Sequence, residues 1–298
     1  MLTRSHVAAA ALLALATLSG CGGVAESAAP SPSAAKDKKH RLEAAKADCM
    51  KQKGFKYVAY VMPQKQESEE ERRRASGDYQ AMRKYREKYG FGVFAMHVYP
   101  KEMGNPAVKP DNPEINPNWK IQSEFSKTQM EAYRKASDAC MAAGVKQVLG
   151  LEVKSDMDYY AERNKISNRM LRASLNSDPK LVELATAMAT CLKGKGYAIG
   201  QTTPTAMSER GPEAFRTEED KLGREQRDDV PDVAPPLKED ELPMYYAPTL
   251  TPEQARPYLT KEIKAALDDL ECGKDFYPVY IPRDSAIQKQ VDDQFGMW

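Results

Sequence analysis

The stretch CMKQKGF at residues 49–55 returns as CLKGKGY at residues 191–197, with the cysteine, both lysines and the glycine at matching positions. In each copy, apolar residues at helical spacing precede the cysteine. The glycine and the aromatic residue after it are typical of a helix end. There the glycine adopts a left-handed backbone conformation, and the aromatic side chain packs onto the last turn of the helix. The two stretches therefore predict two helices that end in the same way.

A second pair of segments repeats in the same order along the chain. The tetrapeptides SKTQ (126–129) and TPEQ (251–254) match the capping-box pattern that opens a helix. Each is followed by a cysteine, Cys140 in the first case and Cys272 in the second. We infer a duplication in which each half contains a helix that ends at a cysteine, a long variable middle and a capped helix with a second cysteine.

Four cysteines belong to this repeat, namely Cys49, Cys140, Cys191 and Cys272. An even number favours disulfides if the chain is exported, which the N-terminal segment described below indicates. Four cysteines allow three pairings. The duplication favours pairing within each half, Cys49 with Cys140 and Cys191 with Cys272. Pairing across the halves would also preserve the symmetry, so it stays open as an alternative.

The fifth cysteine follows an apolar segment at the N-terminus. Residues 7–18 are apolar except for Thr17, and a helix of this length is too short for the roughly 30 Å of a bilayer core. The run is typical of a secretory signal. Leu18-Ser19-Gly20-Cys21 resembles the lipobox of bacterial lipoproteins. We therefore expect residues 1–20 to be a cleaved signal peptide and Cys21 to carry a lipid that anchors the protein on the extracytoplasmic face of the cell membrane.

The remaining chain divides by composition and repeat. Residues 21–40 begin with a small, polar, Pro-containing segment that predicts a flexible tether. Residues 41–150 form the first half, 151–177 a bridging helix and 178–298 the second half.

The predicted fold class is α+β and predominantly helical, with two related, disulfide-linked halves. Aromatic and β-branched runs at 56–62 and 91–99 predict short strands, and 277–281 is a weaker candidate because of Pro278. The Pro-rich stretches 100–117 and 204–252 are expected to be long irregular loops. Within the helix after Thr251, Pro257 predicts a break near Arg256 and a new helix capped by Thr260.

One wider pattern accompanies the repeat. Cys49-Met50 with Gly54-Phe55, then Tyr89-Gly90-Phe91-Gly92, and finally Glu262-Ile263 with Asp268 and Cys272 resemble a pattern of secreted lipoproteins of actinobacteria. The resemblance implies the extracytoplasmic compartment and the disulfide-linked helices. It implies no activity, substrate or catalytic residue.

Charge and motifs exclude several functions. The chain has 44 basic and 43 acidic residues, and one of the basic residues, Arg4, lies in the predicted signal peptide. The remaining chain has no excess of positive charge, which binding to the phosphates of a nucleic acid would require. No metal-ligand or nucleophile motif is present. We therefore predict no catalytic residue, no metal and no cofactor. His97, in an apolar run, is expected to be packed.

Aromatic residues are the remaining candidates for a binding surface. The adjacent pairs Tyr159-Tyr160 and Tyr245-Tyr246, together with Trp119, suit a partly wet interface. The favoured function is a non-enzymatic, membrane-anchored lipoprotein that binds a cell-wall polymer or an envelope protein. The alternatives are a cell-wall hydrolase that uses paired carboxylates and a passive lipoprotein that supports the envelope.

Overall fold

The structure is a computed structural model that describes residues 32–106, 108, 115–233 and 244–297. Within these ranges the chain forms eleven helices and no strand. They are α1 (Pro32–Gln52), α2 (Glu69–Ala75), α3 (Tyr79–Tyr89), α4 (Ala95–Val98), α5 (Pro117–Ser123), α6 (Lys127–Leu149), α7 (Asp156–Leu175), α8 (Pro179–Gly194), α9 (Pro204–Glu225), α10 (Pro252–Cys272) and α11 (Tyr277–Phe295).

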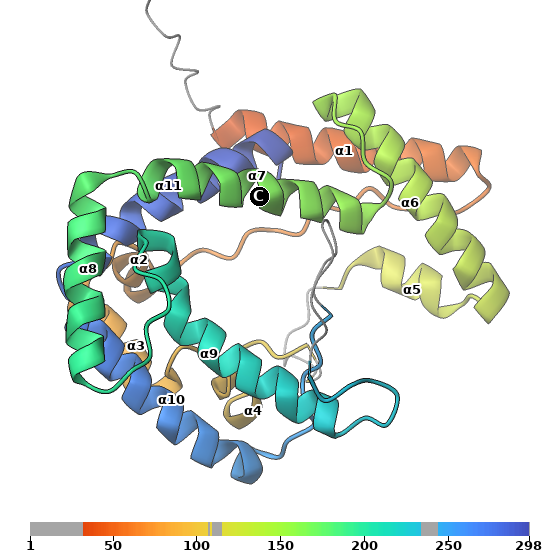
Figure 1. Ribbon diagram of the computed structural model, residues 1–298. Coiled ribbons are helices and arrows are strands. Elements are labelled where there is room, and N and C mark those ends of the chain that lie inside the picture. The colour runs from red at the N-terminus through yellow and green to blue at the C-terminus, as the bar shows by residue number, and fades with distance from the viewer. Residues whose placement is uncertain (1–31, 107, 109–114, 234–243, 298) are drawn as a thin grey trace, which may run out of the picture.

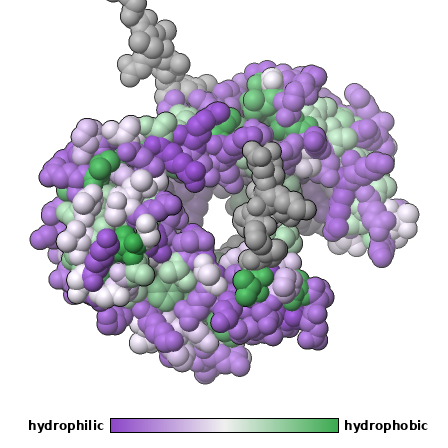
Figure 2. Space-filling view, in the orientation of Figure 1, coloured by the Kyte–Doolittle hydropathy of each residue, from purple (hydrophilic) through white to green (hydrophobic). Residues whose placement is uncertain are grey.

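The helices gather in two groups (Figure 1). In the first group, α6 packs along α1, and α11 packs along both α7 and α1. In the second group, α10 lies in the middle and contacts α3, α4, α8 and α9. The space-filling view shows the molecule hollowed between the two groups (Figure 2). The bridging helix predicted between the halves is α7, capped at its start by Ser155.

The two halves of the repeat share their local structure. Cys49 pairs with Cys140 and Cys191 pairs with Cys272, so the pairing within halves is confirmed. Gly54 and Gly196 both have positive φ angles, 81° and 87°. The residue after each glycine donates its backbone N–H to a carbonyl five residues back. The capping boxes at the start of α6 and α10 are also present.

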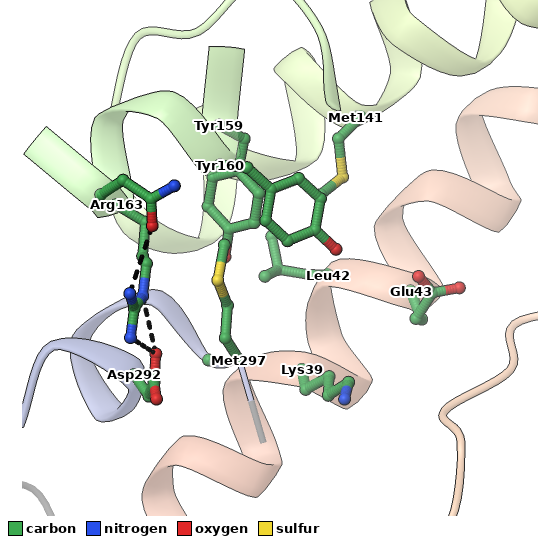
Figure 3. A pocket seen from close by; sticks show the side chains of 11 residues that line it. Lys39, Leu42, Glu43, Met141, Tyr159, Tyr160, Arg163, Asp292 and Met297 are labelled. Carbon is green, nitrogen blue, oxygen red and sulfur yellow. Dashed lines mark hydrogen bonds and ion pairs between the residues drawn. The ribbon is translucent and has the colours of Figure 1, made fainter. Parts of the chain in front are cut away.

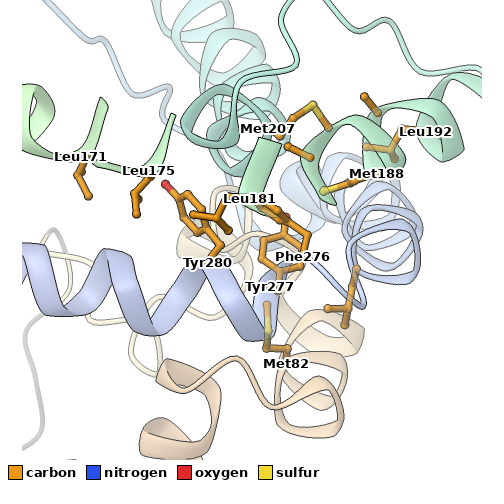
Figure 4. Close-up of a cluster of buried hydrophobic side chains, with 13 residues drawn as sticks. Met82, Leu171, Leu175, Leu181, Met188, Leu192, Met207, Phe276, Tyr277 and Tyr280 are labelled. Atoms are coloured by element: carbon orange, nitrogen blue, oxygen red, sulfur yellow. The ribbon is translucent and has the colours of Figure 1, made fainter. Parts of the chain in front are cut away.

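The halves exchange elements in space. Helices α3 and α4 precede the second half in sequence, yet they pack on α10. Helix α11, at the end of the chain, returns to α7 and α1. The largest apolar cluster accordingly combines Met82 of α3 with residues of α7, α8, α9 and α11 (Figure 4). This cluster lies where the second group of helices meets α7.

The α+β prediction is wrong for the described residues, and the three strand candidates fail for different reasons. At 56–62 the side-chain amide of Asn118 takes the place of a strand partner: its nitrogen donates to the Val58 carbonyl (2.9 Å) and its oxygen accepts from the Val58 N–H (2.8 Å). Residues 91–99 form turns and α4, because the buried Glu262 carboxylate accepts the N–H groups of Val93 and Phe94. Residues 277–281 begin α11, where Pro278 needs no hydrogen-bond partner.

The proline-based predictions also need correction. Residues 204–225 form α9 rather than a loop, since Pro204 occupies the first turn and Met207 is buried. Helix α10 continues through Pro257. Proline cannot donate to the carbonyl four residues back, but Pro257 is exposed, so water can bind that carbonyl instead. Thr260 caps no new helix, and its hydroxyl donates instead to the Arg256 carbonyl (3.0 Å).

Part of the range 21–40, predicted to be a tether, is helical in the structure. Helix α1 begins at Pro32, and Leu42 on the same helix is buried against α6 and α11. The helix therefore extends towards the N-terminus from its buried part. The predicted signal peptide, residues 1–20, and Cys21 lie outside the described residues.

Candidate functional site

The aromatic residues highlighted by the sequence do not form one surface. Trp119 is 54% exposed on α5, and Tyr160 is 54% exposed on α7. Tyr159 is only 3% exposed, because its ring packs on Phe295 and its hydroxyl donates to the Phe295 carbonyl. Tyr159 is therefore buried rather than exposed, and its ring packs beside that of Tyr160.

Tyr245 and Tyr246 lie beside α9 and are engaged by its side chains. The Tyr245 hydroxyl donates to Glu219, whose other oxygen lies 2.5 Å from His97 Nε2. Tyr246 lies under the guanidinium groups of Arg224 and Arg227, at 4.7 and 5.3 Å. The His97 side chain, which pairs with Glu219, is largely buried, as its apolar sequence context predicted. These contacts hold residues 244–250 on α9.

Tyr160 opens onto a cavity of about 420 Å³, here named the tyrosine pocket. It lies where α1, α6, α7 and the end of α11 meet, and Figure 3 shows the two tyrosine rings between α7 and α1. Its apolar side chains are Leu42, Met141, Tyr159 and Met297, and Tyr160 completes the wall. A lining that is mainly apolar and aromatic is typical of a binding site.

Charged side chains border the tyrosine pocket. Arg163 donates to one oxygen of Asp292 through Nε (2.8 Å) and Nη2 (2.6 Å), which fixes the guanidinium in the wall. Lys39 and Glu43 line the α1 side. Burial lowers the pKa of Lys39, and the nearby Glu43 opposes that shift. Burial also raises the pKa of Tyr160, so its hydroxyl stays neutral and available as a donor.

A second cavity of about 590 Å³ lies between α7, the start of α9 and α11. We name it the amide pocket after four of its side chains, Asn168, Asn176, Gln201 and Gln288. Two of these have structural partners. Asn176, the C-cap residue of α7, accepts a hydrogen bond from the backbone N–H of Thr205 (3.0 Å). Gln288 accepts hydrogen bonds from the side chains of Ser167 (2.8 Å) and Arg163 (2.9 Å). The contact of Arg163 with Gln288 joins the two pockets across the α7–α11 interface.

The amide pocket also brings two carboxylates together. Burial raises the pKa of Asp284, and the nearby negative charge of Glu209 adds to the shift. The buried Tyr280 hydroxyl lies 3.5 Å from Asp284 and accepts a hydrogen bond from Ser208 (2.9 Å). A carboxyl whose pKa is raised keeps its proton to a higher pH than a solvated one, and in that form it can act as an acid or donate a hydrogen bond.

Sequence reasoning missed the amide pocket. Its lining comes from three segments, 168–176, 201–209 and 280–288, that carry no motif and are far apart in the chain. Their side chains meet only because α11 folds back onto α7. Two of the segments fell in regions expected to be a loop or a strand, so no helical face was assigned to them.

Comparison of the chain with protein-family models, with curated proteins and with solved structures finds no match. Across the part of the chain that the structure describes, no three His, Cys, Asp or Glu side chains gather as metal ligands. None of the described helices has both the length and the apolar composition needed to cross a bilayer.

Proposed function

We propose that this protein is a lipid-anchored, extracytoplasmic lipoprotein with a non-enzymatic role, and that it binds an envelope protein through the tyrosine pocket. The anchor is supported by Leu18-Ser19-Gly20-Cys21 at the end of a short apolar run. Two acyl chains on one cysteine hold a protein stably on a membrane, whereas a single chain is marginal.

The observation that carries the binding role is the half-exposed ring of Tyr160 over a pocket built from Tyr, Met and Arg side chains. These residue types are enriched in the centres of protein interfaces, and Lys and Glu are depleted there. Lys39 and Glu43 of α1 line the same pocket and give it one charge of each sign. A protein partner that inserts an apolar side chain between Tyr160 and Met297 fits this arrangement better than a polymer that offers only hydroxyl groups.

The anchor is tested by replacing Cys21. In cells, the Cys21→Ser variant should lose metabolic labelling with a fatty acid and leave the membrane fraction, while the parent chain keeps both. Retention of the label by the variant would contradict the proposal.

The binding role is tested at Tyr160. Tyr160→Ala should weaken partner capture from envelope extracts about tenfold or more, because loss of an aromatic anchor costs about 2 kcal/mol. Met157→Ala is the matched control, since Met157 is 66% exposed on the same helix and does not line the pocket. A partner lost equally from both variants, or from neither, argues against the tyrosine pocket. No partner at all would favour a passive envelope role.

A second candidate is a cell-wall hydrolase, favoured by the meeting of Glu209 with Asp284 in the amide pocket. Glycoside cleavage needs one protonated acid and one carboxylate base or nucleophile. The test is release of soluble fragments from purified peptidoglycan by the parent chain and its absence with Asp284→Asn. If the parent chain releases nothing, the hydrolase is excluded.

A further inference from the structure

The segment that joins α1 to α2 (Figure 1) is bonded to the protein along one edge only. Residues 55–68 contain no helix, turn or bend, so the chain is extended there. Asn118 bonds both the N–H and the carbonyl of Val58, at 2.8 and 2.9 Å. In an extended chain these two groups of one residue point to the same edge, and those of the next residue point to the opposite edge. Asn118 therefore covers the edge of Val58 and leaves the opposite edge open.

The open edge carries the backbone groups of Tyr57, Ala59 and Val61. Among the described residues, none of these N–H and carbonyl groups has a hydrogen-bond partner. Ala59, in the middle, is exposed. The edge is bounded by Phe55, whose N–H already donates to a carbonyl of α1 (2.9 Å), and by Pro63, which has no N–H. An exposed edge with free donors and acceptors is a template on which another strand can pair.

The open edge is symmetric about Ala59. If a second copy pairs antiparallel with Ala59 opposite Ala59, Tyr57 of each copy lies opposite Val61 of the other, and each free N–H meets a free carbonyl. Phe55 then lies opposite Pro63, where neither copy has an N–H to give. In this register no free donor of the edge stays without an acceptor, so the edge is complementary to itself.

The side chains suit the same register. Both kinds of cross-strand pair join a tyrosine to a valine, since Val58 lies opposite Tyr60 just as the residues of the open edge do. Pairs of an aromatic and a β-branched residue stabilise antiparallel strands. Met62, which is 51% exposed, would lie against the aliphatic stem of Lys56 of the second copy.

The distribution of charge also favours an antiparallel second copy. Residues 51–56 contain three lysines and no acidic residue, whereas residues 67–71 contain four glutamates and no basic residue. Lys65 alone departs from this division. In an antiparallel pair the basic end of each copy lies towards the acidic end of the other, while a parallel pair would place like charges side by side.

We infer that two copies of this chain form a dimer by antiparallel pairing of residues 57–61 about a two-fold axis at Ala59. Such a contact uses the same surface on both copies. Asn118 covers the other edge of each segment, so pairing stops at two copies. The dimer uses neither the tyrosine pocket nor the lipid anchor.

Cysteine cross-linking tests the contact and its register. The Cα atoms of an opposed, hydrogen-bonded pair lie about 5.5 Å apart, a distance that a disulfide spans. Ala59→Cys should therefore give a disulfide-linked dimer of the full chain on a non-reducing gel, above the background of the parent chain. Lys56→Cys and Met62→Cys should cross-link with each other when the two variants are mixed, and neither should cross-link with itself.

Sedimentation equilibrium over a range of concentrations measures the dimer directly. Ala59→Pro removes the central N–H from both copies and should raise the dissociation constant about tenfold or more. Because that N–H has no partner within the described chain, the variant should unfold at the same temperature as the parent. Gln66→Pro is the matched control, since Gln66 is exposed in the same segment but lies beyond Pro63.

A dimer that cross-links in this register, is weakened by Ala59→Pro and is kept in Gln66→Pro supports the inference. A chain that is monomeric at every concentration, a dimer that survives Ala59→Pro, or self-cross-linking of Lys56→Cys overturns it. Cross-linking of Ala59→Cys to a different protein without a dimer also overturns it, and would assign the open edge to a foreign strand. Tyr160→Ala should dimerise like the parent, which separates this interface from the proposed binding role of the tyrosine pocket.

Discussion

Gly223 illustrates how one residue sets a contact between distant segments. A Cβ atom at this position of α9 would lie 1.7 Å from the Tyr246 carbonyl oxygen, so the chain after α9 can approach the helix only where no side chain exists. Gly223→Ala should lower the free energy of unfolding by about 1–3 kcal/mol, because overpacking must displace residues 244–250. Urea denaturation followed by circular dichroism measures this change.

Gly194 is the matched control for that substitution. It lies at the end of α8, and a Cβ atom there would meet nothing within 4 Å. Gly194→Ala should therefore raise the free energy of unfolding by up to about 1 kcal/mol, through helix propensity alone. Equal losses from both substitutions would show that the Tyr246 contact is not the cause.

Among the helices, Asp268 joins α10 to the end of α8. Its carboxylate accepts from Lys264 (2.9 Å), Tyr197 (2.8 Å) and Lys195 (3.0 Å). These bonds, with that of Lys264 the largest cause, hold the pKa of Asp268 well below its ordinary value of 3.8. The stabilisation is present above pH 3.8 and is lost as the pH falls below it, because the unfolded chain then binds a proton that the folded carboxylate resists.

Asp268→Asn should consequently lower the free energy of unfolding at pH 7 and reduce the loss of stability between pH 5 and pH 2. Thermal unfolding across this pH range measures both effects. Asp275→Asn serves as the control, since it removes an exposed carboxylate just beyond the end of α10. A profile of Asp268→Asn that matches the parent would contradict the role of this carboxylate.

The two disulfides should contribute similarly to stability. They close loops with sequence separations of 91 and 81 residues, and the chain-entropy model gives about 4.5 kcal/mol for each. Replacing both Cys191 and Cys272 by Ser should lower the free energy of unfolding by up to this amount. Replacing both Cys49 and Cys140 by Ser should lower it by a similar amount. Denaturation of both double variants tests the equivalence, which would fail if either variant kept full stability.

At the scale of the whole molecule, a buried charge cluster fastens the exchanged elements. Asp269 on α10 is fully buried and accepts from Arg86 of α3 (2.7 Å), Arg210 of α9 (3.2 Å) and the Tyr277 hydroxyl of α11. Four helices from both halves of the sequence thus meet at one carboxylate. The cluster makes the position of α3 depend on the second half of the chain.

Arg86→Met should therefore destabilise the protein by about 3–5 kcal/mol, because it leaves part of a buried charge uncompensated. Arg83→Met, which removes an exposed ion pair with Glu87 on the same helix, should cost less than about 1 kcal/mol. Urea denaturation compares the two. Similar costs for both variants would show that the cluster does not hold the halves together.

Local signals in the sequence predicted the parts of the fold that depend on neighbouring residues. Asp178 with Pro179 begins α8, and the capping boxes begin α6 and α10, because a helix cap needs only residues three positions apart. Strand predictions failed at 91–99, where the determining partner is Glu262, about 170 residues away. From the sequence alone, a glutamate at position 262 would be expected on the solvent-exposed face of its helix. It is buried because α3 and α4 pack on α10.

The sequence by itself predicted the matching helix ends after Cys49 and Cys191, the disulfide pairing that the repeat favoured and the capping boxes. The tertiary structure decided that the halves exchange α3, α4 and α11, that Tyr159 is core while Tyr160 faces a pocket, and that the amide pocket exists. The physical reason is the range of the interactions. Caps and helical periodicity act within a few residues, whereas burial and pocket lining depend on which distant helix covers a face, and that choice is made by packing of the whole chain.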